Sequence, residues 1–242
     1  LMGNGNLALL HQDSYAGISA WSRIIQGSRI KDIVTLPDEN GTDVLYMLVE
    51  RNIQGVNRLY LEAIADWEYA TESKWNYTNS AVTFIPPSPT NVITGLDHLE
   101  GRRVQVIGDQ RFLGTFLVAS GEITLLDGTD TAINVSSAII GTAWTARIRT
   151  MPLVGQDPGS SKRYSSLYVR CLNSSRPMIN NKRPPDRDPF RIMNESQDLD
   201  IIADYEQEIL GWNRTQVIEV KENLPVRTEV IGIYGSVKSN SL

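Results

Sequence analysis

Short apolar segments of strand length, separated by turns that contain glycine, asparagine or aspartate, run through the whole sequence, and helical periodicity is nearly absent. The segments are rich in Val, Ile, Leu and Tyr, which favour an extended backbone in a sheet. In the first third of the chain they lie at residues 18–24, 29–36, 42–51 and 56–64. Because this pattern does not match a helical bundle or an alternating βαβ domain, we expect a mainly β fold.

The turns between these first segments carry the residue types that tight hairpins need. Residues 38–41 and 52–55 separate the later pairs, residues 26–28 separate the first pair, and each turn contains Gly or Asn. Both residue types tolerate the positive φ of a short hairpin turn. We therefore predict an antiparallel β-meander over residues 1–80, which is either a propeller blade or one sheet of a sandwich-like platform. Residues 7–12 are interpreted as the end of an earlier strand.

A proline-rich stretch marks a boundary after this meander. Pro86, Pro87 and Pro89 lie close together, and proline lacks the N–H that a sheet ladder requires. Residues 81–152 then form a second part, whose closely packed short strands predict an inserted small β-barrel domain. The strands expected in this part are residues 102–107, 112–119, 122–126 and 139–151.

The last part, residues 153–242, is expected to return to the platform. Its predicted strands are residues 164–172, 216–221 and 226–237, and an irregular proline-rich stretch lies between the first two of them. Cys171 falls inside a predicted strand, so we expect a buried and unreactive thiol. The opening Leu1-Met2-Gly3 already lies in a strand-and-turn pattern, which suggests a piece of a longer protein.

Charge and hydropathy argue against two classes of protein. With 23 basic and 28 acidic residues, the net charge of −5 argues against a dedicated nucleic-acid binder, because such proteins normally carry a basic excess. A wall past which DNA slides remains compatible with this charge. No apolar run approaches the roughly 18 residues of a membrane-spanning helix. A lone cysteine also rules out an intrachain disulfide framework.

One loop places a histidine between two acids. It reads Gly95, Leu96, Asp97, His98, Leu99, Glu100 and Gly101. A metal site or an acid–base pair is one interpretation. The other is that Asp97 or Glu100 binds turn amides while His98 packs the loop. His11 is the only other histidine and no cysteine is near, so a zinc site lacks ligands. We favour the structural interpretation and expect no metal site.

Patterns typical of enzymes are missing elsewhere. No Gly-x-Ser-x-Gly motif places a nucleophile on a strand-to-helix turn, and no glycine-rich loop leads into a helix as phosphate binding requires. The many carboxylates show no spacing that singles out a catalytic pair of the glycosidase kind. We therefore expect a protein that is not an enzyme and that has no cofactor.

A basic cluster lies in the proline-rich stretch. It contains Arg176, Lys182, Arg183, Arg187 and Arg191, with two acids among them. These residues are candidates for contact with a neighbouring subunit or with DNA phosphates. A solvated loop with local ion pairs is the alternative, which we favour over a DNA contact.

Aromatic residues gather before the proline boundary. Trp67, Tyr69, Trp75 and Tyr77 lie among polar residues without a regular period. They are compatible with an interface patch or a carbohydrate platform. Packing at a domain junction is the interpretation that we favour.

The segment around the histidine loop resembles one found in the tail tube, or nozzle, proteins of tailed bacteriophages. The resemblance rests on residues 92–109 and on Gly121-Glu122-Ile123-Thr124-Leu125. Residues 43–51 and 58–62 before it, and residues 162–172 and 226–237 after it, are similar to the strands that flank this segment in that family. Residues 140–144 depart from the pattern that commonly follows the barrel.

This resemblance implies a structural virion protein of the tail, assembled in the host cytoplasm. The family forms a ring of six copies that provides a channel for DNA ejection and an anchor for tail fibres. Its implied partners are further copies of the chain, tail adaptor and fibre proteins, and DNA in transient, sequence-independent contact. Two alternatives stay open, namely an all-β carbohydrate-binding or receptor-binding tail component and a generic β-sandwich adhesion or scaffold module.

Overall fold

The structure, a computed structural model, consists almost entirely of antiparallel β-strands. It describes residues 1–15, 17–25, 27–64, 77–109, 111–153, 160–174, 176–184, 200–206 and 211–240. Within these residues the sole helical element is one 3-10 turn, η2 (Asp97–Leu99). The chain divides into two compact units, Leu1–Thr142 and Ala143–Leu242. The prediction of a mainly β fold is confirmed.

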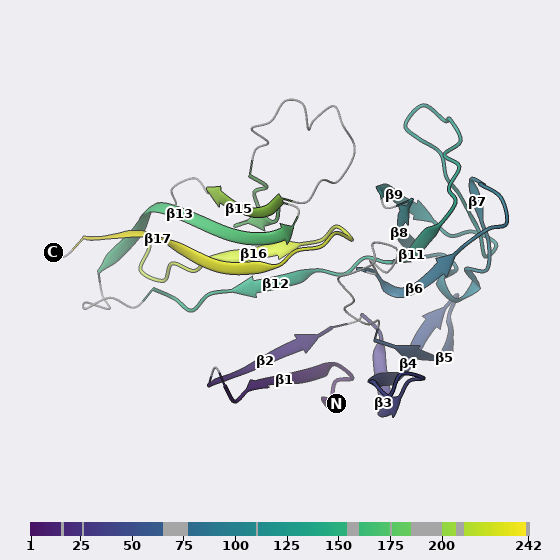
Figure 1. The fold of residues 1–242 in the computed structure, drawn as a ribbon, viewed down its shortest axis with the longest axis horizontal. Coiled ribbons are helices and arrows are strands. Elements are labelled where there is room, and N and C mark those ends of the chain that lie inside the picture. Colours follow the sequence, from purple (N-terminus) through teal and green to yellow (C-terminus); the bar gives the residue numbers. More distant parts are fainter. Residues whose placement is uncertain are drawn as a thin grey trace. The chain divides into compact units, whose positions relative to one another are not determined.

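The first unit begins with a hairpin of its own. Strands β1 (Leu7–Asp13) and β2 (Ile18–Ile24) pair antiparallel along their whole length, and together they form a separate two-stranded sheet (Figure 1). The prediction that residues 18–24 open a four-stranded meander is therefore wrong. Residues 7–13 supply the partner of β2. The start of the next strand contacts the N-terminal turn instead of β2, because the Ile30 N–H donates to the Gly5 carbonyl over 2.9 Å.

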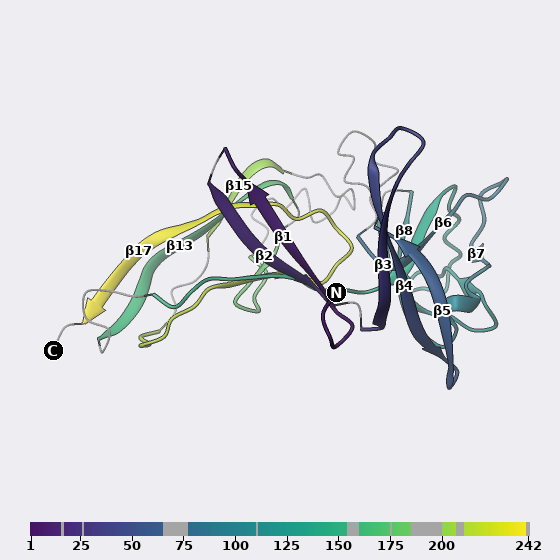
Figure 2. The same cartoon turned by 90° about the horizontal axis from the view of Figure 1, so that it is seen from below.

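Three strands make the meander that follows. They are β3 (Arg29–Pro37), β4 (Asp43–Ile53) and β5 (Val56–Ala63), with β4 in the centre. Figure 2 shows them side by side. Their turns use the predicted chemistry: the Asp38 carboxylate accepts from the Thr42 N–H over 2.8 Å, and Gly55 has a φ of +83°. One face of the sheet packs Met47 and Val49 against Leu7 of the hairpin and Ile30.

Six further strands build the part of the first unit that carries the histidine loop. They are β6 (Asn79–Phe84), β7 (Val92–Ile93), β8 (Arg103–Gly108), β9 (Arg111–Leu117), β10 (Ile123–Thr124) and β11 (Ala138–Thr142). They form one sheet in the order β6-β11-β8-β9 and one short β10-β7 ladder. Both contribute to a single core, with Val104, Val106 and Ile140 from the sheet and Ile93 and Ile123 from the ladder.

This arrangement corrects the predicted barrel. Among the described strands no closed barrel forms, because β6 and β9 are the edges of the larger sheet and do not pair with each other. The predicted boundaries also differ from the observed units. Strand β6 crosses residue 80 and pairs with β11, whereas the expected strand at residues 139–151 is divided between β11 in the first unit and β12 in the second.

The second unit packs two three-stranded sheets around one core. Its strands are β12 (Ala146–Arg149), β13 (Ser161–Ser174), β14 (Met178–Ile179), β15 (Asp200–Glu206), β16 (Glu219–Glu222) and β17 (Val230–Asn240). Their orders are β12-β16-β14 and β15-β13-β17. Leu167, Val169 and Cys171 of β13 meet Ile179 and Val220 of the other sheet in this core. Cys171 is buried, as the sequence predicts.

Candidate functional site

The histidine loop is held by two leucines and two glycines. Leu96 and Leu99 are fully buried in the core of the first unit, and the Leu99 N–H donates to the Leu96 carbonyl over 2.8 Å. Gly95 and Gly101, at the two ends of the loop, have φ angles of +82° and +72°. Residues with a side chain rarely adopt this conformation, so glycine at both ends permits the tight path.

Glu100 closes the loop onto the turn at residues 118–122. Its carboxylate accepts from the backbone N–H of Ser120 at 3.1 Å and of Gly121 at 2.7 Å. In the same contact, the Leu96 N–H donates to the Gly121 carbonyl over 2.8 Å. Gly121 has a φ of +71°, which residues with a side chain rarely adopt, and a Cβ there would lie 2.6 Å from Oδ1 of Asp97. The prediction that an acid of this loop binds turn amides is confirmed for Glu100.

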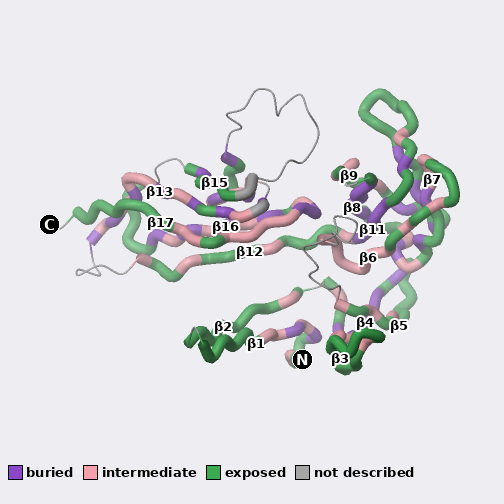
Figure 3. Tube along the Cα trace, in the orientation of Figure 1, coloured by how far each residue is buried: buried purple, intermediate pink, exposed green. Residues whose placement is uncertain are grey.

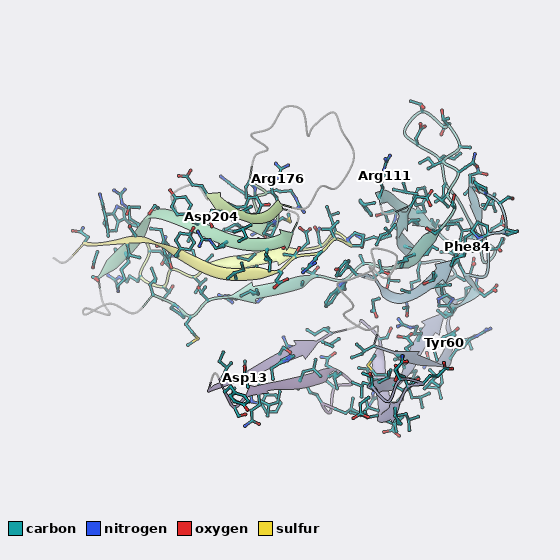
Figure 4. The ribbon with its side chains drawn as sticks, in the orientation of Figure 1. Asp13, Tyr60, Phe84, Arg111, Arg176 and Asp204 are labelled. Atoms are coloured by element: carbon teal, nitrogen blue, oxygen red, sulfur yellow. The ribbon has the colours of Figure 1, made fainter. Side chains whose placement is uncertain are left out.

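His98 contacts the strands that precede the loop in sequence. Its Nε2 lies 3.4 Å from the carbonyl oxygen of Ser80 in β6. Its ring meets Tyr60 of β5 edge-on, with the ring centroids 6.2 Å apart and the planes at 60°. Tyr60 is labelled in Figure 4. His98 therefore packs against strands β5 and β6, a role that differs from packing within its own loop.

A buried ion pair lies next to this contact. Arg51, which is 5% exposed, donates to the Glu62 carboxylate from Nε over 2.9 Å and from Nη2 over 2.7 Å. Nη1 of Arg51 donates to the Ser28 hydroxyl over 2.9 Å, and the Ser80 hydroxyl donates to Glu62 over 2.8 Å. Ser80 thus contacts the ion pair of the meander through its hydroxyl and His98 through its carbonyl oxygen.

A second link runs parallel to the first. Nη2 of Arg102, directly after the loop, donates over 3.1 Å to the carbonyl oxygen of Asn52 in the β4–β5 hairpin. The loop and its flanking residue therefore connect the meander sheet to the sheet of strands β6, β8, β9 and β11. The sequence does not reveal the roles of Arg51, Glu62 and Arg102, because nothing in the local pattern indicates which residues of separate strands meet.

Two of the acidic side chains at this junction are engaged in contacts within the fold. In the described parts of the chain, no group of three or more His, Cys, Asp or Glu residues is arranged to hold a metal ion. The Glu62 carboxylate binds Arg51 and Ser80, the Glu100 carboxylate binds backbone amides, and Asp97 is exposed to solvent. The Glu62 contacts join the meander sheet to β6, and the Glu100 contacts close the histidine loop onto its neighbouring turn.

Two residues of the basic cluster meet each other, and Arg183 is used within the fold. Its guanidinium donates to both oxygens of Glu222, at 2.9 and 2.7 Å, and Glu222 is buried. It also donates to the carbonyl oxygen of Arg176. Lys182 closes a tight turn with Ile179, whose N–H donates to the Lys182 carbonyl over 2.8 Å. A buried carboxylate needs such a partner, so Arg183 stabilises the second unit.

The remaining predicted residues lie outside the described part of the chain. This holds for Arg187 and Arg191 of the basic cluster and for Trp67, Tyr69 and Trp75 of the aromatic group. Tyr77 is described and half-buried.

An exposed polar and aromatic surface on the second unit was missed by sequence analysis. Arg170 and Asp204, on the paired strands β13 and β15, form two hydrogen bonds of 2.8 and 2.7 Å. The guanidinium carbon lies 5.4 Å from the ring centroid of Tyr234, and Tyr234 stacks on Tyr168 at 5.6 Å. The hydrogen bonds from Arg170 lower the pKa of Asp204 to about 2. Strand alternation places each residue on this face, but only the sheet order brings them together.

Comparisons with known proteins leave the family open. A scan against protein-family models finds no match, and a search of curated proteins finds no similar chain. Within the described residues, no helix has the length and apolar character needed to cross a membrane.

Proposed function

We propose that this chain is a structural virion protein, a component of the tail tube or nozzle of a tailed bacteriophage. In this role, copies of the chain form a ring-shaped channel for DNA ejection and an anchor for tail fibres, with a tail adaptor as a further neighbour. The protein would be assembled in the host cytoplasm and reside in the virion tail. The resemblance of residues 92–109 and 121–125 to that family supports the proposal.

The observation that carries the proposal is the exposure of large apolar side chains on regular β-structure. Trp21 of the β1–β2 hairpin is 72% exposed and Leu61 of the meander sheet is 70% exposed. Monomeric soluble proteins rarely leave extended apolar patches facing water, and such patches mark surfaces that contact another protein. An assembly subunit needs surfaces of this kind.

The fold suits a rigid wall. The sheets are antiparallel, short turns join β3 to β4 and β4 to β5, and the junction of Glu62, Ser80 and His98 fastens one sheet to the next. We assign the meander sheet and the second unit to the platform of such proteins, and the part that carries the histidine loop to their inserted domain. A net charge of −5 would keep a channel wall from holding the DNA that passes it.

Ring formation by the purified protein tests the proposal. Size-exclusion chromatography with light scattering is expected to show a concentration-dependent assembly, and negative-stain images are expected to show rings with a central hole. A protein that stays monomeric from micromolar to near-millimolar concentration would contradict the proposal.

A second candidate, a carbohydrate-binding or receptor-binding tail component, is favoured by one observation. The stacked rings of Tyr168 and Tyr234 lie beside the Arg170–Asp204 ion pair on an exposed face. Flat aromatic surfaces beside polar groups suit sugar rings. Binding on a glycan array that is lost in a Tyr168→Ala/Tyr234→Ala variant would favour this function over the first.

A further inference from the structure

The β1–β2 hairpin carries an uncovered apolar face. Leu10 and Trp21 are cross-strand partners, and both are exposed. Alternation places Arg23 on the same face as Trp21. Figure 3 shows that the distal part of the hairpin is exposed on both strands. An isolated two-stranded hairpin is only marginally stable in water, so this face gains stability when another surface covers it.

The meander sheet carries a second uncovered apolar face. Val34 and Leu36 of β3, with Leu59 and Leu61 of β5, are exposed. The register places them on one face, because Val34 pairs with Tyr46 and Leu61 pairs with Leu48 on the central strand, and these alternate with the buried Met47 and Val49. The exposed carboxylate of Asp32 lies on this face as well, since Asp32 pairs with Leu48.

The hairpin cannot cover this face in its own chain. Its base residues Leu7 and Ile24 pack with Met47 and Val49, which lie on the opposite face of the sheet. Only residues 25–28 connect β2 to β3. Trp21 lies on the same strand as Ile24, three residues away. The part of the hairpin that carries Trp21 therefore stays on the Met47 and Val49 side of the sheet. Another copy of the chain can bring its hairpin to the uncovered face.

The two faces are complementary in charge. Arg23 borders the apolar pair of the hairpin and Asp32 borders the apolar patch of the sheet. Among the described residues neither side chain forms an ion pair, and the Asp32 carboxylate accepts only the N–H of Ile33 over 2.9 Å. A guanidinium and a carboxylate at the rims of two apolar faces fix the partner and its orientation.

We propose that the hairpin of one copy docks on the meander sheet of the next copy, with Trp21 covering Leu59 and Leu61 and Arg23 pairing with Asp32. This inference rests on the proposed assembly of identical copies and names the surfaces that join them. Because the two surfaces differ, the contact is heterologous. It repeats from copy to copy and closes into a ring when the rotation allows it.

Charge reversal tests the pairing. Arg23→Asp and Asp32→Arg each place like charges together, and each variant alone is expected to associate about 10-fold more weakly than the wild-type chain. The Arg23→Asp/Asp32→Arg double variant restores opposite charges and is expected to associate within about 3-fold of wild type, the factor that roughly 0.6 kcal/mol represents. Light scattering over a concentration series measures all of them.

Mixing the two single variants gives a sharper test. The hairpin of an Arg23→Asp chain then meets the sheet of an Asp32→Arg chain, and the unchanged hairpin of the second variant meets the unchanged sheet of the first. Opposite charges face each other at both contacts, so alternating assemblies are expected where neither variant assembles alone. Trp21→Ala and Leu61→Asn act as independent apolar variants and are expected to weaken association without restoration by mixing. Circular dichroism confirms that each variant is folded.

Cross-linking locates the contact directly. Cys171 is the only cysteine, it is buried, and burial raises the pKa of its thiol to about 11. Cysteines introduced at positions 23 and 32 are therefore the reactive ones. An Arg23→Cys/Asp32→Cys chain is expected to form a ladder of disulfide-linked oligomers, and an Arg23→Cys/Glu39→Cys chain serves as the control.

The outcomes distinguish a failure of the proposed interface from a failure of the proposed function. Wild-type assembly that survives both charge reversals and Trp21→Ala would overturn the interface and leave the nozzle function standing. A wild-type chain that remains monomeric would overturn both. A chain that never self-associates but binds a different protein through Trp21 would overturn the choice of a second copy as the occupant.

Discussion

Arg51 and Glu62 form an ion pair in which Nη2 of the arginine lies 2.7 Å from one carboxylate oxygen and 2.9 Å from the other. The pair is nearly shielded from solvent, and the Ser80 hydroxyl binds the same carboxylate. It therefore joins the meander sheet to β6, the first strand of the next sheet. Opposite charges at this depth depend on each other, because a buried charge without its partner is costly.

Removal of one partner is expected to destabilise the first unit strongly. Arg51→Met leaves the partly buried Glu62 carboxylate without its cation, and the free energy of unfolding should fall by about 2–3 kcal/mol. The Arg51→Met/Glu62→Leu double variant should cost less than the single variant, since neither charge remains. Urea unfolding followed by fluorescence measures both. Lys31→Met, which breaks the exposed Lys31–Glu50 pair, is the control and should cost under about 1 kcal/mol.

Glu100→Ala tests the closure of the histidine loop. The substitution leaves the N–H groups of Ser120 and Gly121 without their charged acceptor, so stability is expected to fall by about 1.5–3 kcal/mol. Thermal unfolding measures the change. Glu122→Ala on the same turn is the matched control, because the Glu122 side chain is exposed. Equal losses in the two variants would show that the carboxylate of Glu100 has no special role.

Strand positions in the meander are predictable because they depend on local patterns. The turn of Asn52 and Gly55 sets the register of β4 and β5, and the observed strands fall within a few residues of the predicted ones. The pairing partner of β2, in contrast, is not predictable from a local pattern. Its exposed residues, among them Ile18 and Trp21, favour a strand without indicating which neighbour it pairs with.

Contacts between distant residues account for the rest of what the sequence does not indicate. Residues 139–151 are predicted as one strand, yet strand β11 ends at Thr142. Gly141 packs so closely on β6 that a Cβ there would lie 2.8 Å from the carbonyl oxygen of Asn79, and this contact ties β11 to the first unit. The packing of His98 against Tyr60 is equally non-local. The sequence offers no further metal ligands near the histidine loop, which indicates a structural role for it. Which residues the loop contacts depends on the fold and cannot be read from the sequence.

The pH dependence of Asp204 follows from its contact with Arg170. The hydrogen bonds from Arg170, and to a smaller extent the Tyr234 hydroxyl, lower the pKa of Asp204 from 3.8 to about 2. Since the folded pKa lies below the unfolded one, the ion pair contributes stability above pH 3.8 and loses it as pH falls toward 2. In an NMR titration, Arg170→Gln is expected to return the pKa of Asp204 toward 3.8. Arg147→Gln, which breaks the exposed Arg147–Glu219 pair, should leave it unchanged.

High salt offers an independent check on that assignment. Asp204 is exposed, so roughly 1 M NaCl, with a screening length of about 3 Å, should bring its pKa closer to 3.8. A pKa of Asp204 that stays near 2 in the Arg170→Gln variant would contradict the role of Arg170.

Gly235 and Gly232 on β17 provide a matched pair for backbone packing. A Cβ on Gly235 would lie 2.1 Å from the carbonyl oxygen of Ser166 on β13, whereas a Cβ on Gly232 would meet nothing within 4 Å. Backbone cannot move aside as a flexible side chain can, so Gly235→Ala is expected to separate the two strands locally and to cost about 1–3 kcal/mol. Gly232→Ala should be neutral or slightly stabilising, because alanine reduces the freedom of the unfolded chain. Urea unfolding of the two variants measures the difference, and hydrogen exchange at the amides of residues 161–167 should accelerate in Gly235→Ala alone. Equal stability of the two variants would mean that β13 and β17 do not approach each other as closely as the structure has them.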